Sequence, residues 1–327
     1  MRLVDLHCDW LLQYAGETTL DDSPTAIDAS RLARLDGYLH GVAATVLICR
    51  RSSAGWDASA DRWRSLDTLI TRYEAEFAGR LLIGPDDIPR YDESLRLGGL
   101  CYGVLGIGEL GGLVLEPGDL DSLARVFDRG ARLFQLVSGP EGALAGSSAP
   151  GDDRGLTPLG RDCLTRLAEQ AQDAAGPRTI VDLSGMGPNA TSQTLDWFQE
   201  QPSRVDRLAV VWSRGGLADP GIANRANLER LRAIGGLVGL SPGRPHHESP
   251  ESLKAAIETL AALPFLGQAG YQGIAVGSDL FGLEQTLPGL ENAPRIASWL
   301  AKNFDREVAH ELGRGAGTRA ILGAAGA

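Results

Sequence analysis

Lysine is almost absent from this chain. Lys254 and Lys302 are the only lysines among 31 basic residues, and both fall in segments with helical spacing rather than at the end of a strand. Schiff-base catalysis and the bridging of two metal ions by a modified lysine therefore have no obvious residue to use. The four cysteines are widely spaced and form no C-x-x-C pair, a pattern typical of buried free thiols rather than a zinc knuckle or a disulfide framework.

The chain also lacks an excess of positive charge and long apolar runs. Its net charge of -11 and pI of about 5.0 argue against a nucleic-acid partner, because lysine and arginine supply most of the affinity for phosphate backbones. No apolar run approaches the ~20 residues of a membrane span, and the first strand-like run begins at Leu3, which leaves no room for a signal peptide. We therefore expect a cytoplasmic protein without a membrane partner.

What the sequence does contain is an alternation of apolar, strand-like runs with segments of helical spacing. The strand-like runs cover residues 3–6, 42–49, 101–107, 132–137, 179–184, 208–213, 236–241 and 273–279. The helix-like segments cover residues 32–39, 58–77, 120–130, 157–175, 191–201, 224–234 and 252–263, and three short helices follow from about residue 293. Residues 139–154 show little periodicity and predict a long loop. Eight such pairs predict an α/β protein with a single (β/α)8 TIM-barrel domain spanning residues 1–327. An open doubly wound sheet is disfavoured because no G-x-G-x-x-G motif follows an early strand.

Several ionisable residues stand at the ends of these predicted strands. His7 and Asp9 follow the first strand two residues apart, so in extended chain their side chains point the same way about 7 Å apart. Glu109 ends the third strand and Asp279 the eighth. In a barrel, the carboxyl ends of the strands build one site, and three carboxylates sharing a cavity repel unless a cation neutralises them. A bound metal ion is the simplest neutraliser, and arginine is the second.

Five short motifs occur in order along the chain, most of them at strand ends. They are Asp5-Leu6-His7-Cys8-Asp9, Ile107-Gly108-Glu109-Leu110-Gly111-Gly112, Gly155-Leu156-Thr157-Pro158-Leu159-Gly160, Asp182-Leu183-Ser184 and Gly277-Ser278-Asp279-Leu280-Phe281-Gly282. Each motif is weak alone, but in this order the set resembles the membrane (renal) dipeptidases, which are binuclear zinc peptidases on a (β/α)8 barrel. The resemblance runs over nearly the whole chain.

The resemblance implies roles for individual residues. It implies that His7, Asp9 and Glu109 bind the first zinc ion, with Asp279 as the catalytic proton acceptor. It also implies that the substrate carboxylate is held by an arginine, for which Arg225 is the candidate.

The chain departs from the family pattern at three positions where histidines are expected. The two histidines of the second zinc ion are replaced by Gly185 and Arg214, and the carbonyl-polarising histidine after the fourth strand corresponds to Ser138 or its neighbour. Glycine has no side chain to coordinate, and a guanidinium is always cationic and offers no lone pair. We therefore expect a divergent relative with one zinc ion or none, in which Arg214 places a fixed positive charge where a second metal ion would sit.

Two functions remain open from the sequence. The first is a dipeptidase-like hydrolase that cleaves a peptide or amide bond of a small substrate with metal-activated water, in a form that the resemblance suggests is a homodimer. The second is a catalytically inactive relative that uses Arg50, Arg214 and Arg225 to bind a small anion, or that binds a protein partner. His246 and His247 follow the seventh strand, where an exposed polar loop is favoured over a role in the site.

Overall fold

The eight predicted strands form a closed parallel barrel in which sequence order is also spatial order. The computed structural model describes residues 1–9, 38, 40–49, 62–98, 100–171, 176–201, 203, 208–244, 246–280 and 285–323. The strands are β1 (Leu3–Cys8), β2 (Val42–Cys49), β3 (Tyr102–Ile107), β4 (Ala131–Gln135), β5 (Thr179–Asp182), β6 (Leu208–Trp212), β7 (Leu237–Leu240) and β8 (Ile274–Val276). Every strand residue is buried, which explains why these strands read as continuous apolar runs. The predicted (β/α)8 barrel is confirmed.

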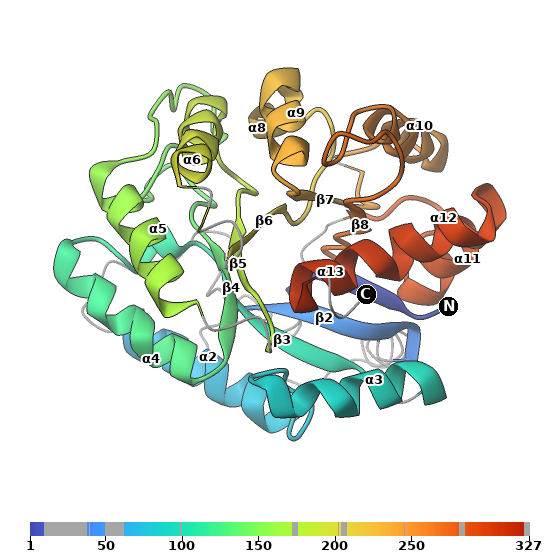
Figure 1. Cartoon of the computed structure of the whole chain (residues 1–327), viewed down its shortest axis with the longest axis horizontal. Coiled ribbons are helices and arrows are strands. Elements are labelled where there is room, and N and C mark those ends of the chain that lie inside the picture. The colour runs from blue at the N-terminus through green and yellow to red at the C-terminus, as the bar shows by residue number, and fades with distance from the viewer. Residues whose placement is uncertain are drawn as a thin grey trace.

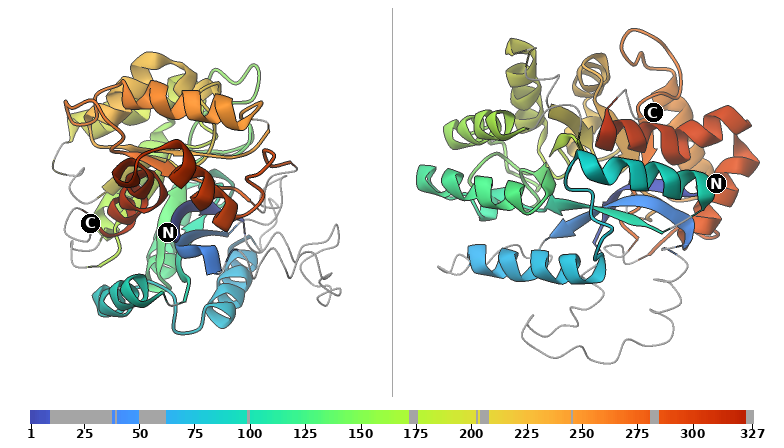
Figure 2. Two further views of the ribbon diagram at one scale, coloured as in Figure 1. Left: turned by 90° about the vertical axis from the view of Figure 1, so that its right-hand side faces the viewer. Right: turned by 60° about the horizontal axis from the view of Figure 1, so that its bottom comes forward.

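Helices surround the barrel, as Figures 1 and 2 show. They are α2 (Arg62–Glu76), α3 (Ile88–Leu97), α4 (Ser122–Asp128), α5 (Pro158–Gln170), α6 (Pro188–Glu200), α8 (Pro220–Ala223), α9 (Arg225–Ala233), α10 (Pro250–Ala261), α11 (Ala293–Asn303), α12 (Arg306–His310) and α13 (Ala316–Leu322). The sequence analysis did not anticipate α3, a second helix between β2 and β3. Tyr91 is the buried residue of α3 and meets Tyr102 of β3 edge to face. Residues 32–37, in a predicted helix, lie outside the described part of the chain.

The seam between β1 and β8 is held together mainly by the Asp5 side chain. Only one backbone pairing, Asp5 with Val276, joins the two strands. The Asp5 carboxylate accepts hydrogen bonds from the backbone nitrogens of Ser278 (2.8 Å) and His7 (3.1 Å), and from the Ser278 and Tyr38 hydroxyls. Burial raises the pKa of Asp5, and these hydrogen bonds act in the opposite direction. Beyond the seam, the backbone nitrogen of Asp279 donates to the His7 carbonyl (3.0 Å). The seam therefore sets Asp279 opposite His7.

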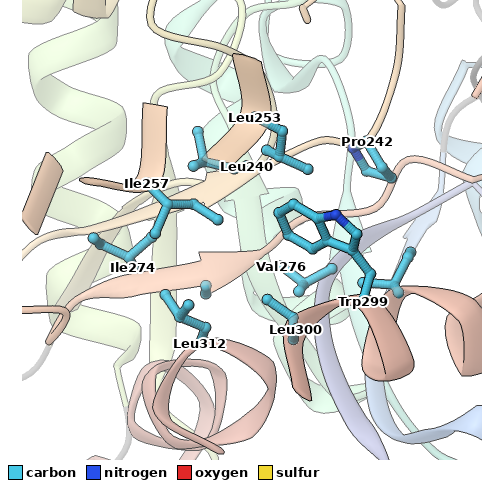
Figure 3. Close-up of a pocket in the computed structure, with 11 residues that line it drawn as sticks. Leu240, Pro242, Leu253, Ile257, Ile274, Val276, Trp299, Leu300 and Leu312 are labelled. Carbon is cyan, nitrogen blue, oxygen red and sulfur yellow. The ribbon is translucent and has the colours of Figure 1, made fainter. Parts of the chain in front are cut away.

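On the side of β7 and β8 that faces the helices, aliphatic side chains pack against α10 and α11. A small cavity of about 20 Å³ remains between these elements, lined by Leu240, Leu253, Trp299 and eight other residues. Figure 3 shows the side chains that surround it. The described residues that line this cavity include no charged side chain, so it is part of the core.

The loop predicted over residues 139–154 is confirmed, since it contains neither helix nor strand apart from isolated bridges at Ala145 and Ser147. Asp152 organises it by accepting from the Ser147 backbone (2.7 Å) and hydroxyl (2.9 Å) and from Arg154 Nε (2.8 Å). These hydrogen bonds fix the loop beside the ends of β4 and β5.

Within the described residues, the structure contains no helix long and apolar enough to cross a membrane.

Candidate metal centre and adjoining cavity

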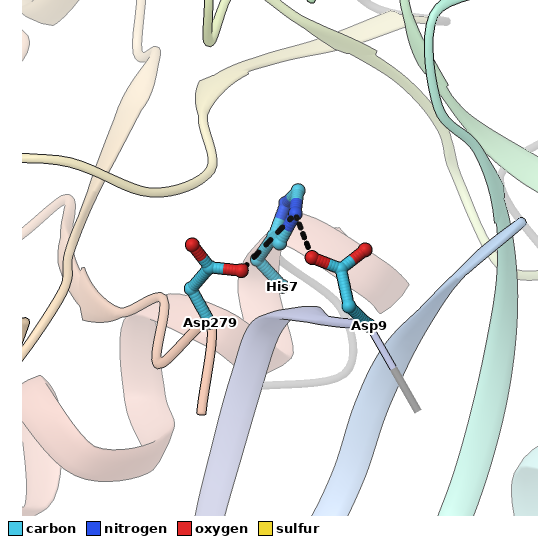
Figure 4. A group of neighbouring side chains, drawn as sticks. All are labelled: His7, Asp9 and Asp279. Carbon is cyan, nitrogen blue, oxygen red and sulfur yellow. Dashed lines mark ion pairs between the residues drawn. The ribbon is translucent and has the colours of Figure 1, made fainter. Parts of the chain in front are cut away.

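Three buried side chains meet at the carboxyl ends of β1 and β8. His7 Nε2 lies 3.8 Å from Asp9 Oδ2 and 4.0 Å from Asp279 Oδ1, and one ligand atom from each residue lies within 4.8 Å of the others. Figure 4 shows the imidazole between the two carboxylates. We call these three residues the His7 cluster. A tetrahedral zinc ion with ligands about 2.1 Å away separates its ligand atoms by about 3.4 Å, so the two distances from His7 Nε2 exceed that separation by only about half an ångström.

The hydrogen bonds on the Nδ1 side of His7 determine its tautomer, and so determine which ring nitrogen presents a lone pair to the carboxylates. Ser213 Oγ lies 2.5 Å from Asp182 Oδ2 and 2.8 Å from His7 Nδ1. An ionised carboxylate only accepts, so the serine hydroxyl donates to Asp182 and accepts from Nδ1–H. His7 Nε2 is then left with its lone pair toward Asp9 and Asp279. A histidine ligand held through its second nitrogen is the usual arrangement in metal sites.

The unmet hydrogen-bonding capacity of the cluster fits a cation. Among the described residues, neither His7 Nε2 nor Asp279 Oδ1 has a hydrogen-bond partner, although both atoms are buried. The 3.8 and 4.0 Å separations are too long for direct hydrogen bonds. Imidazole nitrogen with carboxylate oxygen is a donor set that suits zinc. The residues present therefore fit a divalent metal ion.

Asp279 divides its two oxygens between the cluster and an arginine. Its Oδ1 faces His7, whereas its Oδ2 accepts from Arg214 Nη1 at 2.5 Å. Asp279 also has a left-handed backbone, with φ of 50°, an uncommon conformation that aims its side chain into the barrel mouth. Burial raises the pKa of Asp279, and the positive charge of Arg214 opposes that shift. This ion pair holds Asp279 in place.

Glu109 does not join the His7 cluster. It is buried at the end of β3, with φ of 56°, and its Oε1 lies 3.4 Å from the point that a Cβ on Gly139 would occupy. Its carboxylate thus lies beside the loop that follows β4. The sequence analysis placed Glu109 with His7 and Asp9 as a ligand and gave Asp279 the role of proton acceptor. The structure brings Asp279 to that pair, and the role of Glu109 as a ligand stays a prediction.

The three positions that depart from the family pattern lie around one cavity of about 180 Å³. Its lining consists of Ser138, Ser148, Ser184, Gly185, Trp212, Arg214, Asp219, Pro220 and His246, and we call it the Arg214 cavity. At Gly185, φ is 87° and a Cβ would lie 2.6 Å from the Val137 carbonyl oxygen. The backbone itself therefore leaves no room for a histidine at position 185.

The sequence analysis missed the part that His246 plays in this cavity. It favoured an exposed polar loop for His246 and His247, and that interpretation is wrong. His246 Nδ1 lies 3.1 Å from Asp219 Oδ1, and both side chains line the Arg214 cavity. His247 is only 6% exposed, and its burial lowers its pKa to about 4. Pairing with Asp219 could not be anticipated, because Asp219 lies in a different loop.

Two other residues proposed for substrate binding receive no support from the structure. Arg225 begins α9 with a side chain that is 77% exposed, and its Nε donates to Glu229 on the same helix at 2.6 Å. Its role as a carboxylate clamp stays a prediction. Arg50 lies outside the described residues. Ser138 and Arg214, by contrast, both line the Arg214 cavity.

Known proteins resemble this chain in sequence and in fold. No protein-family model matches it. It is 26% identical over 194 residues to an uncharacterized dipeptidase of Schizosaccharomyces pombe, an alignment that covers 56% of this chain and 43% of that protein. The chain thus spans less than half the length of that relative.

Two solved structures from Pseudomonas aeruginosa share the fold over nearly the whole chain. An amidohydrolase superposes with a TM-score of 0.66 at 13% identity, covering 96% of this chain and 94% of that one. The probable dipeptidase PvdM superposes with a TM-score of 0.69 at 15% identity, covering 99% and 95%. At such low identity, these two likenesses establish the barrel fold alone.

Proposed function

We propose that this protein is a dipeptidase-like, metal-dependent hydrolase with a single metal site at the His7 cluster. The observation that carries the proposal is the buried, hydrogen-bond-deficient face that His7 Nε2 and Asp279 Oδ1 present to one point. The relative named as a dipeptidase and the amidohydrolase and dipeptidase folds point in the same direction. The substrate would be a small molecule with a peptide or amide bond.

The residues of the chain divide the work as follows. His7 and Asp9 bind the ion, and Asp279 Oδ1 completes the set, in place of the expected Glu109. Arg214 holds Asp279 Oδ2 and so fixes the direction of Oδ1. When bound, a divalent ion polarises a carbonyl and lowers the pKa of a water molecule, which is the chemistry that amide hydrolysis requires. The Arg214 cavity offers space for the substrate beside the cluster. A cytoplasmic location and a homodimer stay predictions.

The second candidate is a non-catalytic relative that binds a small anion. What favours it is the loss of all three histidines at Ser138, Gly185 and Arg214, together with the permanent cation in the cavity. Both candidates use the same cavity, but only the first requires the His7 cluster to hold a metal ion.

Metal content and turnover separate the two candidates. The full chain is purified, and bound zinc and manganese are measured by elemental analysis before and after reconstitution. Hydrolysis of dipeptides is then measured with each metal. We expect one ion per chain, lost in Asp9→Asn and retained in the matched control Asp196→Asn, a surface residue on α6. If the wild-type protein has neither bound metal nor turnover, the proposal that it is a hydrolase is refuted.

The same experiment decides the role of Asp279. If Asp279 is the third ligand, Asp279→Asn lowers the metal affinity. If it is only a proton acceptor, as the sequence suggested, the variant keeps its metal ion and loses turnover.

A further inference from the structure

Hydrogen-bond donors predominate among the polar groups that line the Arg214 cavity. Arg214 and the Trp212 indole only donate, and the hydroxyls of Ser138 and Ser148 can donate. The Ser184 hydroxyl is engaged with the Ser213 hydroxyl and the Arg214 backbone. Among the described residues of the lining, Asp219 is the only carboxylate, and both its oxygens are engaged. Its Oδ2 accepts from the Gly216 backbone nitrogen (3.0 Å), and its Oδ1 pairs with His246. A surface that offers donors and few open acceptors suits a ligand that only accepts.

Two of these donors are buried without a partner. The Trp212 side chain is 1% exposed, and its Nε1 has no hydrogen-bond partner among the described residues. The same holds for Nε of Arg214. Buried donors are nearly always satisfied in native proteins, so each unsatisfied group requires an explanation. A bound acceptor in the cavity that both side chains line would supply it.

His246 adds a second group that can carry positive charge. Asp219 accepts the proton of its Nδ1, which leaves Nε2 as the ring nitrogen available to a ligand in the cavity that His246 lines. An imidazole donates through Nε2 as well as Nδ1 when it is in the imidazolium form, the form that an anion beside Nε2 would pair with. The charged or titratable groups around this ring are Asp219, His247 and Arg214. Because Arg214 is shared with Asp279, His246 is the second basic side chain that the cavity can direct at a ligand.

We propose that the Arg214 cavity binds a carboxylate group, held between the Arg214 guanidinium and the His246 imidazole and also contacted by the Trp212 indole N–H and the serine hydroxyls. At about 180 Å³, the cavity has several times the ~30 Å³ that one water molecule occupies in the liquid, which is room for a carboxylate with a short side chain. Arg214 contacts Asp279 as well, so the carboxylate lies beside the His7 cluster. Assigning this carboxylate to the free end of an amide substrate rests on the proposed function, whereas carboxylate binding itself does not.

Acetate and acetamide form a matched pair of probes, since they share one shape and differ in charge. Binding is followed by 13C line broadening on chelator-treated protein, so that acetate has no metal ion to ligate. We expect saturable acetate binding and at least about tenfold weaker acetamide binding, because a hydrogen bond to a charged group is stronger than a neutral one. Equal binding of the two probes, or no binding of acetate, would overturn the proposal.

Variants then localise the acetate. His246→Gln should weaken acetate binding about tenfold, and Trp212→Phe, which removes only the indole N–H, about fivefold. His310→Gln, a histidine on the exposed side of α12, should leave binding unchanged. If Trp212→Phe fails to fold, the His246 variant and the probe pair still decide. Acetate binding that is indifferent to His246→Gln would place the ion elsewhere and overturn the proposal.

The source of the carboxylate is tested with alanyl-alanine and alanyl-alaninamide on the metal-loaded enzyme. If the carboxylate belongs to the substrate, the KM for the dipeptide is about tenfold lower than for its amide, and His246→Gln removes the difference. Equal KM values with acetate still bound would refute the substrate assignment and leave a free carboxylate as the ligand. Acetate binding without any hydrolysis refutes the proposed function alone. Hydrolysis without acetate binding refutes the carboxylate cavity alone.

Discussion

The His7 cluster and the Arg214 cavity are neighbours with opposite chemistry. The cluster gathers ligating atoms that can receive a cation, all of them on side chains that are at most 1% exposed. The cavity gathers donors that can receive an anion, and it is partly open. The family resemblance implies a second metal ion in this region. With Gly185 and Arg214 at these positions, the cavity suits an anion rather than a cation. The proposed cation site and the proposed anion site thus share one barrel mouth, where the Arg214–Asp279 ion pair joins them.

Asp182 is the residue whose loss should break both regions at once. Its carboxylate accepts from the backbone nitrogens of Ser184 and Ser213, both at 3.0 Å, and from the Ser213 hydroxyl at 2.5 Å. Asp182→Ala leaves these buried donors unsatisfied, so we expect a loss of about 3 kcal/mol or more in the free energy of unfolding. Urea denaturation measures it. Asp196→Ala, which removes a half-exposed partner of Arg230, should cost about 1 kcal/mol or less. Similar losses in both variants would contradict the bridging role.

Gly185→Ala tests the cavity without touching the cluster. The new Cβ would lie 2.6 Å from the Val137 carbonyl oxygen at a φ of 87°, so we expect a destabilisation of about 2–4 kcal/mol. Gly151→Ala is the matched control, because its φ of 83° is similar but nothing lies within 4 Å. It should cost only about 1 kcal/mol. Thermal unfolding compares the two variants, and equal costs would mean that space at position 185 is not limiting.

The sequence predicts the position of the His7 cluster better than it predicts the Arg214 cavity. The cluster follows from strand periodicity: strands buried on both faces are apolar runs, and their carboxyl ends must converge, which brings Asp279 to His7 across the β1–β8 seam. The cavity depends on loops. His246 and Asp219 come from separate loops whose paths no periodicity encodes, and the support of His7 by Asp182 through Ser213 depends on the β5–β6 register, in which Asp182 pairs with Val211.

Glu109 and α3 show the same limit on a smaller scale. The sequence predicts Glu109 as a ligand because it ends a strand, and this role stays a prediction. What the strand pattern does not report is the left-handed backbone at that residue and the position of its carboxylate beside Gly139. Over residues 88–95 of α3, Tyr91 is the only fully buried residue, so the apolar period of this helix is too weak to stand out. In both cases the deciding information is local backbone geometry that side-chain pattern does not report.

Ser213→Ala should weaken the cluster and spare the cavity. The variant removes the hydroxyl that accepts from His7 Nδ1 (2.8 Å) and connects it to Asp182, so the imidazole loses its fixed orientation. Loss of such a supporting group lowers metal affinity about 10–100-fold. Competition with a chromophoric chelator gives the affinity. Ser138→Ala, on the cavity side, is the control and should keep the wild-type value. Unchanged affinity in Ser213→Ala would remove Asp182 and Ser213 from the metal site.

Asp152→Asn should have the smallest effect and should be confined to the cavity wall. Several hydrogen bonds hold the pKa of Asp152 below its usual range, and the one from the Arg154 side chain has the largest effect. A depressed pKa in the folded state stabilises the protein above the unfolded pKa of about 3.9, and this contribution is lost as the pH falls through the folded value. Between pH 5 and 8 the variant should therefore lose a constant amount, about 1 kcal/mol, and the difference from wild type should shrink in stronger acid. Denaturation at a series of pH values measures it. Because Asp152 braces Ser147, next to the cavity residue Ser148, acetate binding should weaken slightly while the metal content stays at the wild-type level. A loss of metal instead would show that the loop supports the cluster and that the two regions are not separable.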